Sequence, residues 1–277
     1  MIITRPFIFG KLALLIRIRA TYISVTSKFV IKLECFIIQD MRVQALHGWE
    51  VSIARAKEIQ LSLARRVVTE SEVINPSLVA GIDISASDAQ GVARGAVVIL
   101  RYPELSIVEV EIAQGKLTLP YIPGLLSFRE TPLILAACEK LSNVPDFILI
   151  DGQGIAHPRR LGLASHVGLF LDLPTIGCAK SVLCGQHQPV GEDVGSHAEL
   201  LDNGELIGAA LRTKARIRPI YVSVGHKIDL ASALPLVIKC CRGYRLPEPT
   251  RLAHLAAGGM LTSESSCRGN LFDLGVL

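Results

Sequence analysis

Two aspartates stand where a carboxylate is costly to bury. Asp83 lies between two isoleucines in an apolar run typical of a strand, and Asp151 directly follows the continuous apolar run at residues 147–150. A carboxylate in or at the end of a core strand needs a cation or several hydrogen-bond donors as compensation. If the two strands are neighbours, the acids form a negative pocket, and the simplest compensation is a divalent cation. All-oxygen ligands favour magnesium or manganese over zinc.

Each acid also has a purely structural interpretation. Asp83 could be a core acid held by hydrogen bonds, and Asp151 could cap the glycine-containing turn that follows it. Glu130 precedes Thr131 and Pro132, a pair that predicts a helix beginning at this point, and an acid is favoured at a helix N-terminus. The residue pattern alone therefore leaves the metal site and the structural interpretation both open.

Cationic side chains follow the second aspartate in the loop DGQGIAHPRR, residues 151–160. Two glycines allow close approach of the backbone, and the cations are His157, Arg159 and Arg160. Acids for a metal ion beside bases for the flanking phosphates are what a phosphodiester-cleaving site requires. The loop lacks the lysine-containing ending of a phosphate-binding P-loop, and an ordinary basic surface loop is the alternative.

A rigid turn is predicted at residues 120–124, where two prolines stand three positions apart. The segment reads Pro120, Tyr121, Ile122, Pro123 and Gly124. An aromatic and an aliphatic side chain on a stiff turn could wedge between stacked bases, or support a base turned out of the helix. A packed proline turn is the alternative interpretation.

The elements that would position these residues follow a mixed α/β pattern. Three strands in quick succession predict an antiparallel meander, and helices then alternate with strands, so we expect a mixed sheet flanked by helices. Apolar spacing predicts helices over residues 51–67, 161–171 and 230–241, with others beginning at 131 and 248. The expected strands are residues 78–85, 94–101, 106–113, 147–150, 175–178, 205–211 and 220–224.

Composition favours a folded, non-polycationic body. Half of the 277 residues are hydrophobic and 19% are charged, which permits a large core and argues against global disorder. Residues 1–40 hold six Lys or Arg and two Asp or Glu, which equals the whole net charge of +4. Any nucleic-acid binding by residues 41–277 must therefore use a local basic patch.

The chain divides into three predicted parts. Residues 1–40 form an N-terminal extension whose apolar runs are broken by cations and lack a clear signal peptide; it is an organellar transit peptide or precedes a true start at Met41. Residues 41–257 form the main folded domain, and the Gly- and Ser-rich residues 258–277 form a flexible tail. Seven cysteines without a CxxC pair fit a reducing, cytoplasmic location and no cysteine-based zinc site.

Several segments together closely resemble the endonuclease V family, which incises DNA near deoxyinosine. The resemblance covers about residues 46–255 and leaves out the first forty residues and the tail. The matching segments are GIDIS at 81–85, PYIPGLLSFRE at 120–130, DGQGIAHPRRLGLASHVGLFLDLPTIGCAKS at 151–181, SVGHKID at 223–229 and EPTRLAHL at 248–255.

The resemblance implies a ribonuclease-H-like fold and a set of site residues. Asp83, Glu130 and Asp151 correspond to the acids that bind magnesium (Mg²⁺), for which manganese (Mn²⁺) is expected to substitute. Lys180 corresponds to the lysine near the scissile phosphate, and His254 either lies near the metal or relays a proton. The wedge that probes the lesion falls on residues 120–123, and we expect backbone groups of Gly81, Gly124 and Gly154 to lie close to the lesion base.

The resemblance also implies an activity. The expected reaction is hydrolysis of the second phosphodiester bond 3′ to deoxyinosine in double- or single-stranded DNA, leaving 3′-hydroxyl and 5′-phosphate ends. Whether other deaminated bases are substrates stays open, and neither a membrane nor an obligatory protein partner is expected. One alternative is the same chemistry on inosine in RNA, which would differ in contacts near the 2′-hydroxyl. A binding module without catalysis is the other.

Overall fold

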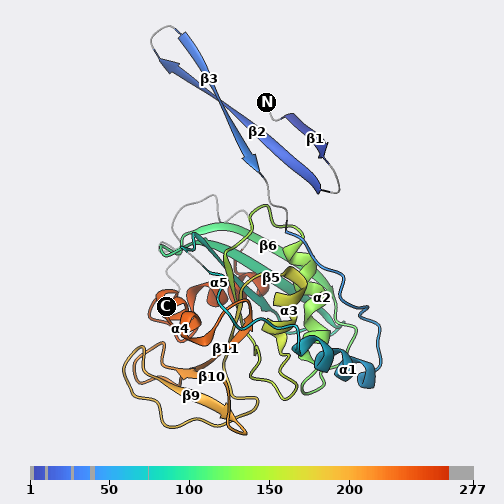
Figure 1. The fold of residues 1–277 in the computed structure, drawn as a ribbon, viewed down its shortest axis with the longest axis vertical. Coiled ribbons are helices and arrows are strands. Elements are labelled where there is room, and N and C mark those ends of the chain that lie inside the picture. The colour runs from blue at the N-terminus through green and yellow to red at the C-terminus, as the bar shows by residue number, and fades with distance from the viewer. Residues whose placement is uncertain (1–2, 10–11, 26–27, 38–40, 74, 262–277) are drawn as a thin grey trace. The chain divides into compact units, whose positions relative to one another are not determined.

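The computed structural model describes residues 3–9, 12–25, 28–37, 41–73 and 75–261, and these fall into two compact units. The smaller unit contains strands β1 (Ile3–Phe9), β2 (Leu12–Val25) and β3 (Lys28–Ile37), paired antiparallel in that order (Figure 1). The predicted tail lies outside the described residues from position 262 onward. The division at residues 40 and 257 stays a prediction.

The larger unit is built on one eight-stranded mixed sheet with strand order β6-β5-β4-β7-β8-β11-β10-β9. Strands β4, β7 and β8 run parallel, and the remaining pairs are antiparallel. The mixed sheet and its antiparallel meander β4-β5-β6 confirm the predicted fold class. The strands are β4 (Leu78–Ile84), β5 (Val92–Arg101), β6 (Ile107–Lys116), β7 (Phe147–Ile150), β8 (Thr175–Ala179), β9 (His197–Asp202), β10 (Glu205–Leu211) and β11 (Ile220–His226).

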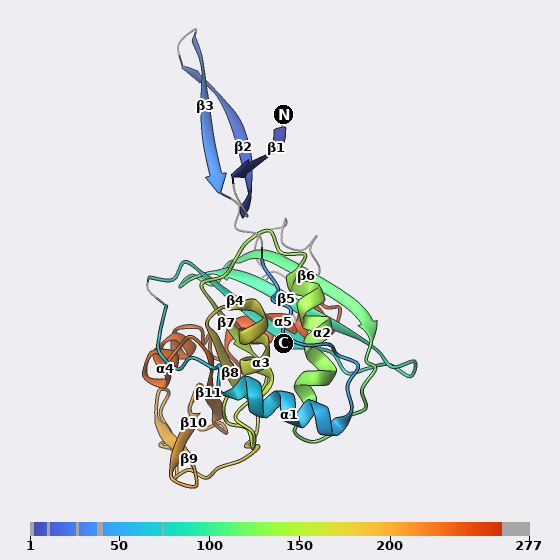
Figure 2. The same cartoon turned by 45° about the vertical axis from the view of Figure 1, so that its right-hand side comes forward.

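Helices cover both faces of this sheet. A Cβ atom at Gly81 would meet Pro249 of α5, and one at Gly95 would meet Leu133 of α2. Gly95 lies an odd number of residues from Val98, the partner of Gly81, so α2 and α5 lie on opposite faces, as Figure 2 shows. The helices are α1 (Ile53–Ala64), α2 (Leu126–Cys138), α3 (Leu163–Leu171), α4 (Leu230–Lys239) and α5 (Glu248–Ala257).

Helix α2 begins earlier than the sequence predicts. It starts at Leu126 and includes Pro132, so the predicted start at Thr131 is wrong. Leu125 and Phe128 are buried in a cluster with residues of α1 and α3, and this packing holds the extra turn despite the proline. Glu130 therefore lies inside the helix, which removes the explanation that it merely favours a helix N-terminus.

Strand β9 was missed by the sequence analysis. Only Leu200 of its six residues is buried, and its remaining positions are exposed or half-buried. A strand at the edge of a sheet with so little burial carries no clear alternation of apolar and polar residues. By contrast, all four residues of β7 are buried, as predicted for a central strand covered on both faces.

Candidate active site

Asp83 and Asp151 lie side by side at the ends of two neighbouring strands. The parallel register of β4 and β7 pairs Ile82 with Ile150. Asp83 follows Ile82 within β4, and Asp151 follows Ile150 directly after the end of β7. The amide of Asp151 also donates to the carbonyl oxygen of Ile82 at 3.2 Å. Neighbouring strands lie about 4.8 Å apart, so two carboxylates meet at one edge of the core.

Helix α5 brings a histidine to the first of these acids. A Cβ at Gly81 would lie 1.9 Å from the carbonyl oxygen of Pro249, so only glycine lets the start of α5 rest directly on β4. His254, in the second turn of this helix, places Nδ1 2.6 Å from Oδ2 of Asp83 and donates its proton there. The close approach at Gly81 therefore sets the distance between the histidine and the carboxylate.

Glu130 of α2 contributes a third carboxylate. Burial, followed by the charges of Asp83 and Asp151, raises the pKa of Glu130 to about 7. Burial and the charge of Asp151 likewise raise the pKa of Asp83, against the hydrogen bond from His254. Negative charge nearby and burial thus disfavour the ionised forms of Glu130 and Asp83, which is the electrostatic condition that a bound cation relieves.

Lys180 supplies a compensating charge from the next strand. It directly follows β8, which pairs with β7, and its Nζ lies 2.5 Å from Oδ2 of Asp151. The Lys180 side chain is 45% exposed and the Asp151 side chain only 12%, so the pair sits at the mouth of the acidic cluster. The structure thus brings together the five predicted catalytic residues from β4, α2 and α5 and from the first positions after β7 and β8.

The donor set fits a hard divalent cation in its chemistry, although its side chains do not converge on one point. Among the described residues, no three His, Cys, Asp or Glu side chains surround a possible metal position. Asp83 and Asp151 are instead turned toward His254 and Lys180. Carboxylate oxygens are the ligands that such a cation prefers, and the ligand set stays a prediction.

A cavity of about 270 Å³ opens beside Asp151. Its walls come from the turn before α2, the loop after β7, the start of α3 and the loop after β8. Its volume is close to the lower end of the roughly 300–1,000 Å³ typical of ligand pockets, which suits a small group such as one base. The lining includes Tyr121, Gly124, Gln153, His157, Leu163 and Lys180.

The predicted wedge has one exposed aromatic tip. Tyr121 is 67% exposed at the rim of this cavity, while Ile122 packs partly buried against the cluster under α1. Pro120 and Pro123 flank them at exposed positions. The turn is therefore anchored by its aliphatic residue and presents its tyrosine to solvent.

His157 and Arg159 tie the loop after β7 to this turn. Nε2 of His157 and Nη2 of Arg159 both donate to the carbonyl oxygen of Gly124, at 3.1 and 2.7 Å. Nδ1 of His157 accepts from the Arg159 amide, and burial together with the charge of Arg159 lowers the histidine pKa to about 4. His157 is therefore neutral near pH 7 and bound within the protein.

Gln60 is a site-supporting residue that sequence reasoning missed. It is fully buried in α1, donates to the carbonyl oxygens of Gly124 and Leu161, and accepts from Nε of Arg159 at 2.6 Å. The available signal was a polar side chain one turn after Ala56 and next to Ile59 on the buried face of the helix. A buried amide needs partners, so its position points to an organised loop nearby.

Arg160 is also engaged within the protein. Its guanidinium pairs with Asp202 at 2.9 Å and Glu205 at 2.7 Å, both from the β9–β10 hairpin. The two arginines of the loop thus have protein partners, and a role of this loop in nucleic-acid binding stays a prediction.

Two of the three glycines expected near a base have other roles. Gly81 and Gly154 are buried, and carbonyl oxygens of Pro249 and Val224 lie 1.9 Å from where their Cβ atoms would be. The expectation is wrong for these two, because both serve close packing of backbone. Gly124 does line the cavity, with φ of +77°, a conformation that favours glycine.

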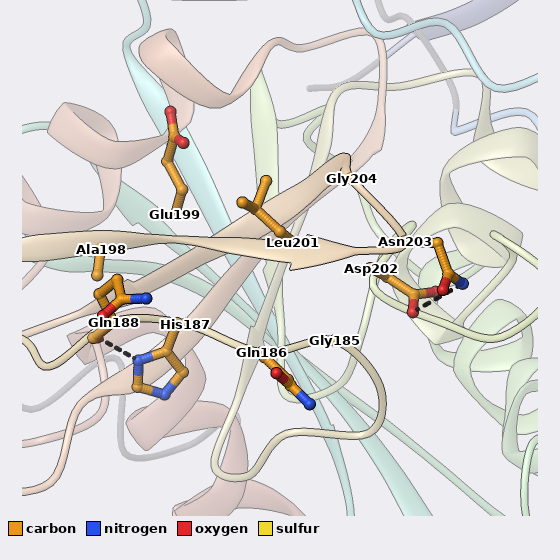
Figure 3. Close-up of a pocket in the computed structure, with 10 residues that line it drawn as sticks. All are labelled: Gly185, Gln186, His187, Gln188, Ala198, Glu199, Leu201, Asp202, Asn203 and Gly204. Carbon is orange, nitrogen blue, oxygen red and sulfur yellow. Dashed lines mark hydrogen bonds between the residues drawn. The ribbon is translucent and has the colours of Figure 1, made fainter.

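A second and larger cavity, of about 680 Å³, lies along the edge strand β9 (Figure 3). It is bounded by residues 185–188, and Gln186 pairs with Leu201 of β9 through two backbone hydrogen bonds. Strand β9 is four positions from β7 in the sheet, about 19 Å at the usual strand spacing. Despite its size, this cavity is remote from the carboxylates, so the smaller one is the candidate site.

Comparison with known proteins identifies the family. The family model for Endonuclease V matches residues 61–255. An endonuclease V of Dehalococcoides mccartyi (strain CBDB1) is 50% identical over 222 residues, which is 80% of this chain and all of that protein. This chain belongs to the endonuclease V family. It is therefore a nuclease, as the resemblance implied.

Solved structures of endonuclease V share the fold. The Streptomyces avermitilis protein superposes with a TM-score of 0.71 at 38% identity, covering 83% of this chain and 96% of that one. The catalytic domain of human endonuclease V gives 0.70 at 32%, covering 75% and 94%. The ribonuclease-H-like prediction is thereby confirmed.

A third neighbour was solved with nucleic acid bound. Ciona intestinalis endonuclease V, in complex with a DNA 24mer containing an inosine followed by a ribo-adenosine, gives a TM-score of 0.64 at 28% identity. The match covers 75% of this chain and 96% of that one.

In the described part of this chain, no helix is long and apolar enough to cross a membrane. The cytoplasmic location stays a prediction.

Proposed function

We propose that this protein is a divalent-metal-dependent endonuclease that cleaves the second phosphodiester bond 3′ to deoxyinosine, leaving 3′-hydroxyl and 5′-phosphate ends. The observation that carries the proposal is the register of β4 and β7, which sets Asp83 beside Asp151 next to the cavity under Tyr121. The inosine-containing DNA bound by the Ciona neighbour supports the choice of substrate.

Asp83, Glu130 and Asp151 would hold the ion. A magnesium or manganese ion there would lower the pKa of a water and stabilise charge on the phosphoryl group. Lys180 leaves Asp151 to offset charge on a phosphate oxygen that approaches the cluster. His254 keeps the Asp83 carboxylate oriented through Nδ1, which leaves Nε2 on its exposed ring to exchange protons with solvent or substrate.

The cavity would receive the lesion base while Tyr121 fills the space it leaves in the strand. The exposure of Tyr121 and the stiffness of its turn suit this role. Three donors hold the carbonyl oxygen of Gly124, so the wall beneath the tyrosine is rigid. In this proposal His157 and Arg159 act on the nucleic acid by fixing that wall.

The test is nicking of a labelled duplex with one deoxyinosine, with magnesium, with manganese and with EDTA. Asp83→Asn should abolish metal-dependent nicking 3′ to the lesion. Asp88→Asn is the matched control, because that carboxylate only accepts from amides of its own turn. Metal-independent nicking, or equal loss in both variants, would refute the proposed site.

Cleavage of inosine-containing RNA is the second candidate. The DNA bound by the Ciona neighbour contains an inosine followed by a ribo-adenosine, so a 2′-hydroxyl beside the inosine is compatible with that complex. Duplexes of one sequence with deoxyribose or ribose at that single position would separate the two. Faster cleavage of the ribose-containing strand would favour the RNA reading.

A further inference from the structure

Lys180 depends on its backbone for its position. Its long, half-exposed side chain has many rotamers. The position of the Lys180 backbone therefore limits where its ammonium group can lie. That point is the first residue of a loop, directly after β8. Two side chains bind consecutive carbonyl groups here. Nη2 of Arg245 donates to the carbonyl oxygen of Lys180 at 2.6 Å, and Nε2 of Gln153 donates to the carbonyl oxygen of Ser181 at 2.8 Å.

Arg245 links this point to two other segments. The same guanidinium donates to the carbonyl oxygens of Arg218 at 3.0 Å and Pro219 at 2.8 Å, just before β11. The Arg245 carbonyl accepts in turn from Oγ1 of Thr213 at 2.5 Å. Strand β11 is the neighbour of β8, and Arg245 precedes α5, so one planar group joins the Lys180 loop to the sheet and to the helix of His254.

We propose that Arg245 is a positioning residue that fixes the backbone from which Lys180 reaches Asp151 and the phosphate. The chemical consequence rests on the function proposed above for Lys180. Without Arg245, the Lys180 carbonyl turns to water and the loop samples more positions. The rate of cleavage should therefore fall, although Arg245 itself lines neither the cavity nor the turn of Tyr121.

Arg212 provides a matched control. It is half-buried like Arg245, and its guanidinium also takes three carbonyl oxygens, those of Val190, Gly191 and Ile217. Ile217 belongs to the same segment as the carbonyls held by Arg245. Arg212→Ala therefore loosens that segment but leaves the hydrogen bond to Lys180 in place.

The experiment compares Arg245→Ala with Arg212→Ala in the full chain, by kinetics on inosine-containing DNA and by hydrogen exchange of residues 180–184. Arg245→Ala should lower kcat by up to about 100-fold and speed exchange in that segment, and Arg212→Ala should do neither. In a Lys180→Ala background, Arg245→Ala should lower kcat little further, because both substitutions remove the same contribution, that of the Lys180 ammonium group.

Three outcomes would overturn the proposal. One is an equal loss of kcat in both arginine variants, and another is an undiminished effect of Arg245→Ala without Lys180. The third is unchanged exchange of residues 180–184 in Arg245→Ala. If the wild-type protein fails to nick inosine-containing DNA, the proposed function fails, and the exchange measurement still decides whether Arg245 positions this loop.

Discussion

Replacing Glu130 by glutamine should stabilise the metal-free protein while abolishing cleavage. Burial and the charges of Asp83 and Asp151 raise the pKa of Glu130 from 4.5 to about 7. The folded protein therefore holds this proton more tightly than the unfolded chain does, and its stability falls as pH rises from 4.5 to 7. Glutamine resembles the protonated acid and carries no charge, so it removes this cost.

The size of the effect follows from the pKa change. Ionised Glu130 is less favourable in the folded protein by about 3 kcal/mol, and this whole difference is present at pH 8. At pH 5 the cost is below about 1 kcal/mol, because the folded protein keeps the carboxyl protonated. For a domain of this size, about 3 kcal/mol corresponds to roughly 6–12 °C in Tm.

The assay is thermal unfolding at pH 5 and pH 8 in EDTA. Glu139→Gln is the control, since Glu139 is an exposed carboxylate at the C-terminal end of the same helix. Magnesium should reduce the difference in Tm between Glu130→Gln and the wild type at pH 8, because an ion that binds the wild type more tightly stabilises it more. An unchanged Tm of Glu130→Gln at pH 8, or an equal gain at both pH values, would refute the electrostatic account of the site.

Three further changes test other parts of the structure. Gly81→Ala should lower the free energy of unfolding in urea by more than about 3 kcal/mol, because its Cβ would overlap Pro249 and push α5 off the sheet; a neutral result would contradict the close approach. Tyr121→Ala should leave Tm unchanged but weaken binding to inosine-containing DNA by about 1–3 kcal/mol, measured by titration, and equal affinity would exclude a stacking role. Burial lowers the pKa of His166, so the protein should lose stability as pH falls below 6.5, where the unfolded chain gains a proton that the folded one resists. In His166→Phe this loss of stability should be smaller, as measured by urea unfolding at pH values from 7 to 5. A pH profile identical to that of the wild type would mean that other groups cause the loss.

Local sequence determined most of the elements and the identity of the acids. The central strand β7 is apolar at every position, and clear turns separate the strands of the meander β4-β5-β6, so both features could be predicted. Asp83 and Asp151 could be identified as site candidates because the first interrupts an apolar run and the second directly follows one. These signals depend only on neighbours along the chain, and the segments shared with endonuclease V added the roles of Lys180 and His254.

Tertiary structure decided how those residues meet. The β4–β7 register, the contact between Gly81 and Pro249, and the hydrogen bonds of Arg245 join segments that lie far apart in sequence, and no local period encodes such pairings. The same holds for Arg159. Its charge is evident from the sequence, but its hydrogen bonds to Gln60 and Gly124 are not. Residue type determines which chemistry is possible here, and packing between distant segments determines which groups are close enough to perform it.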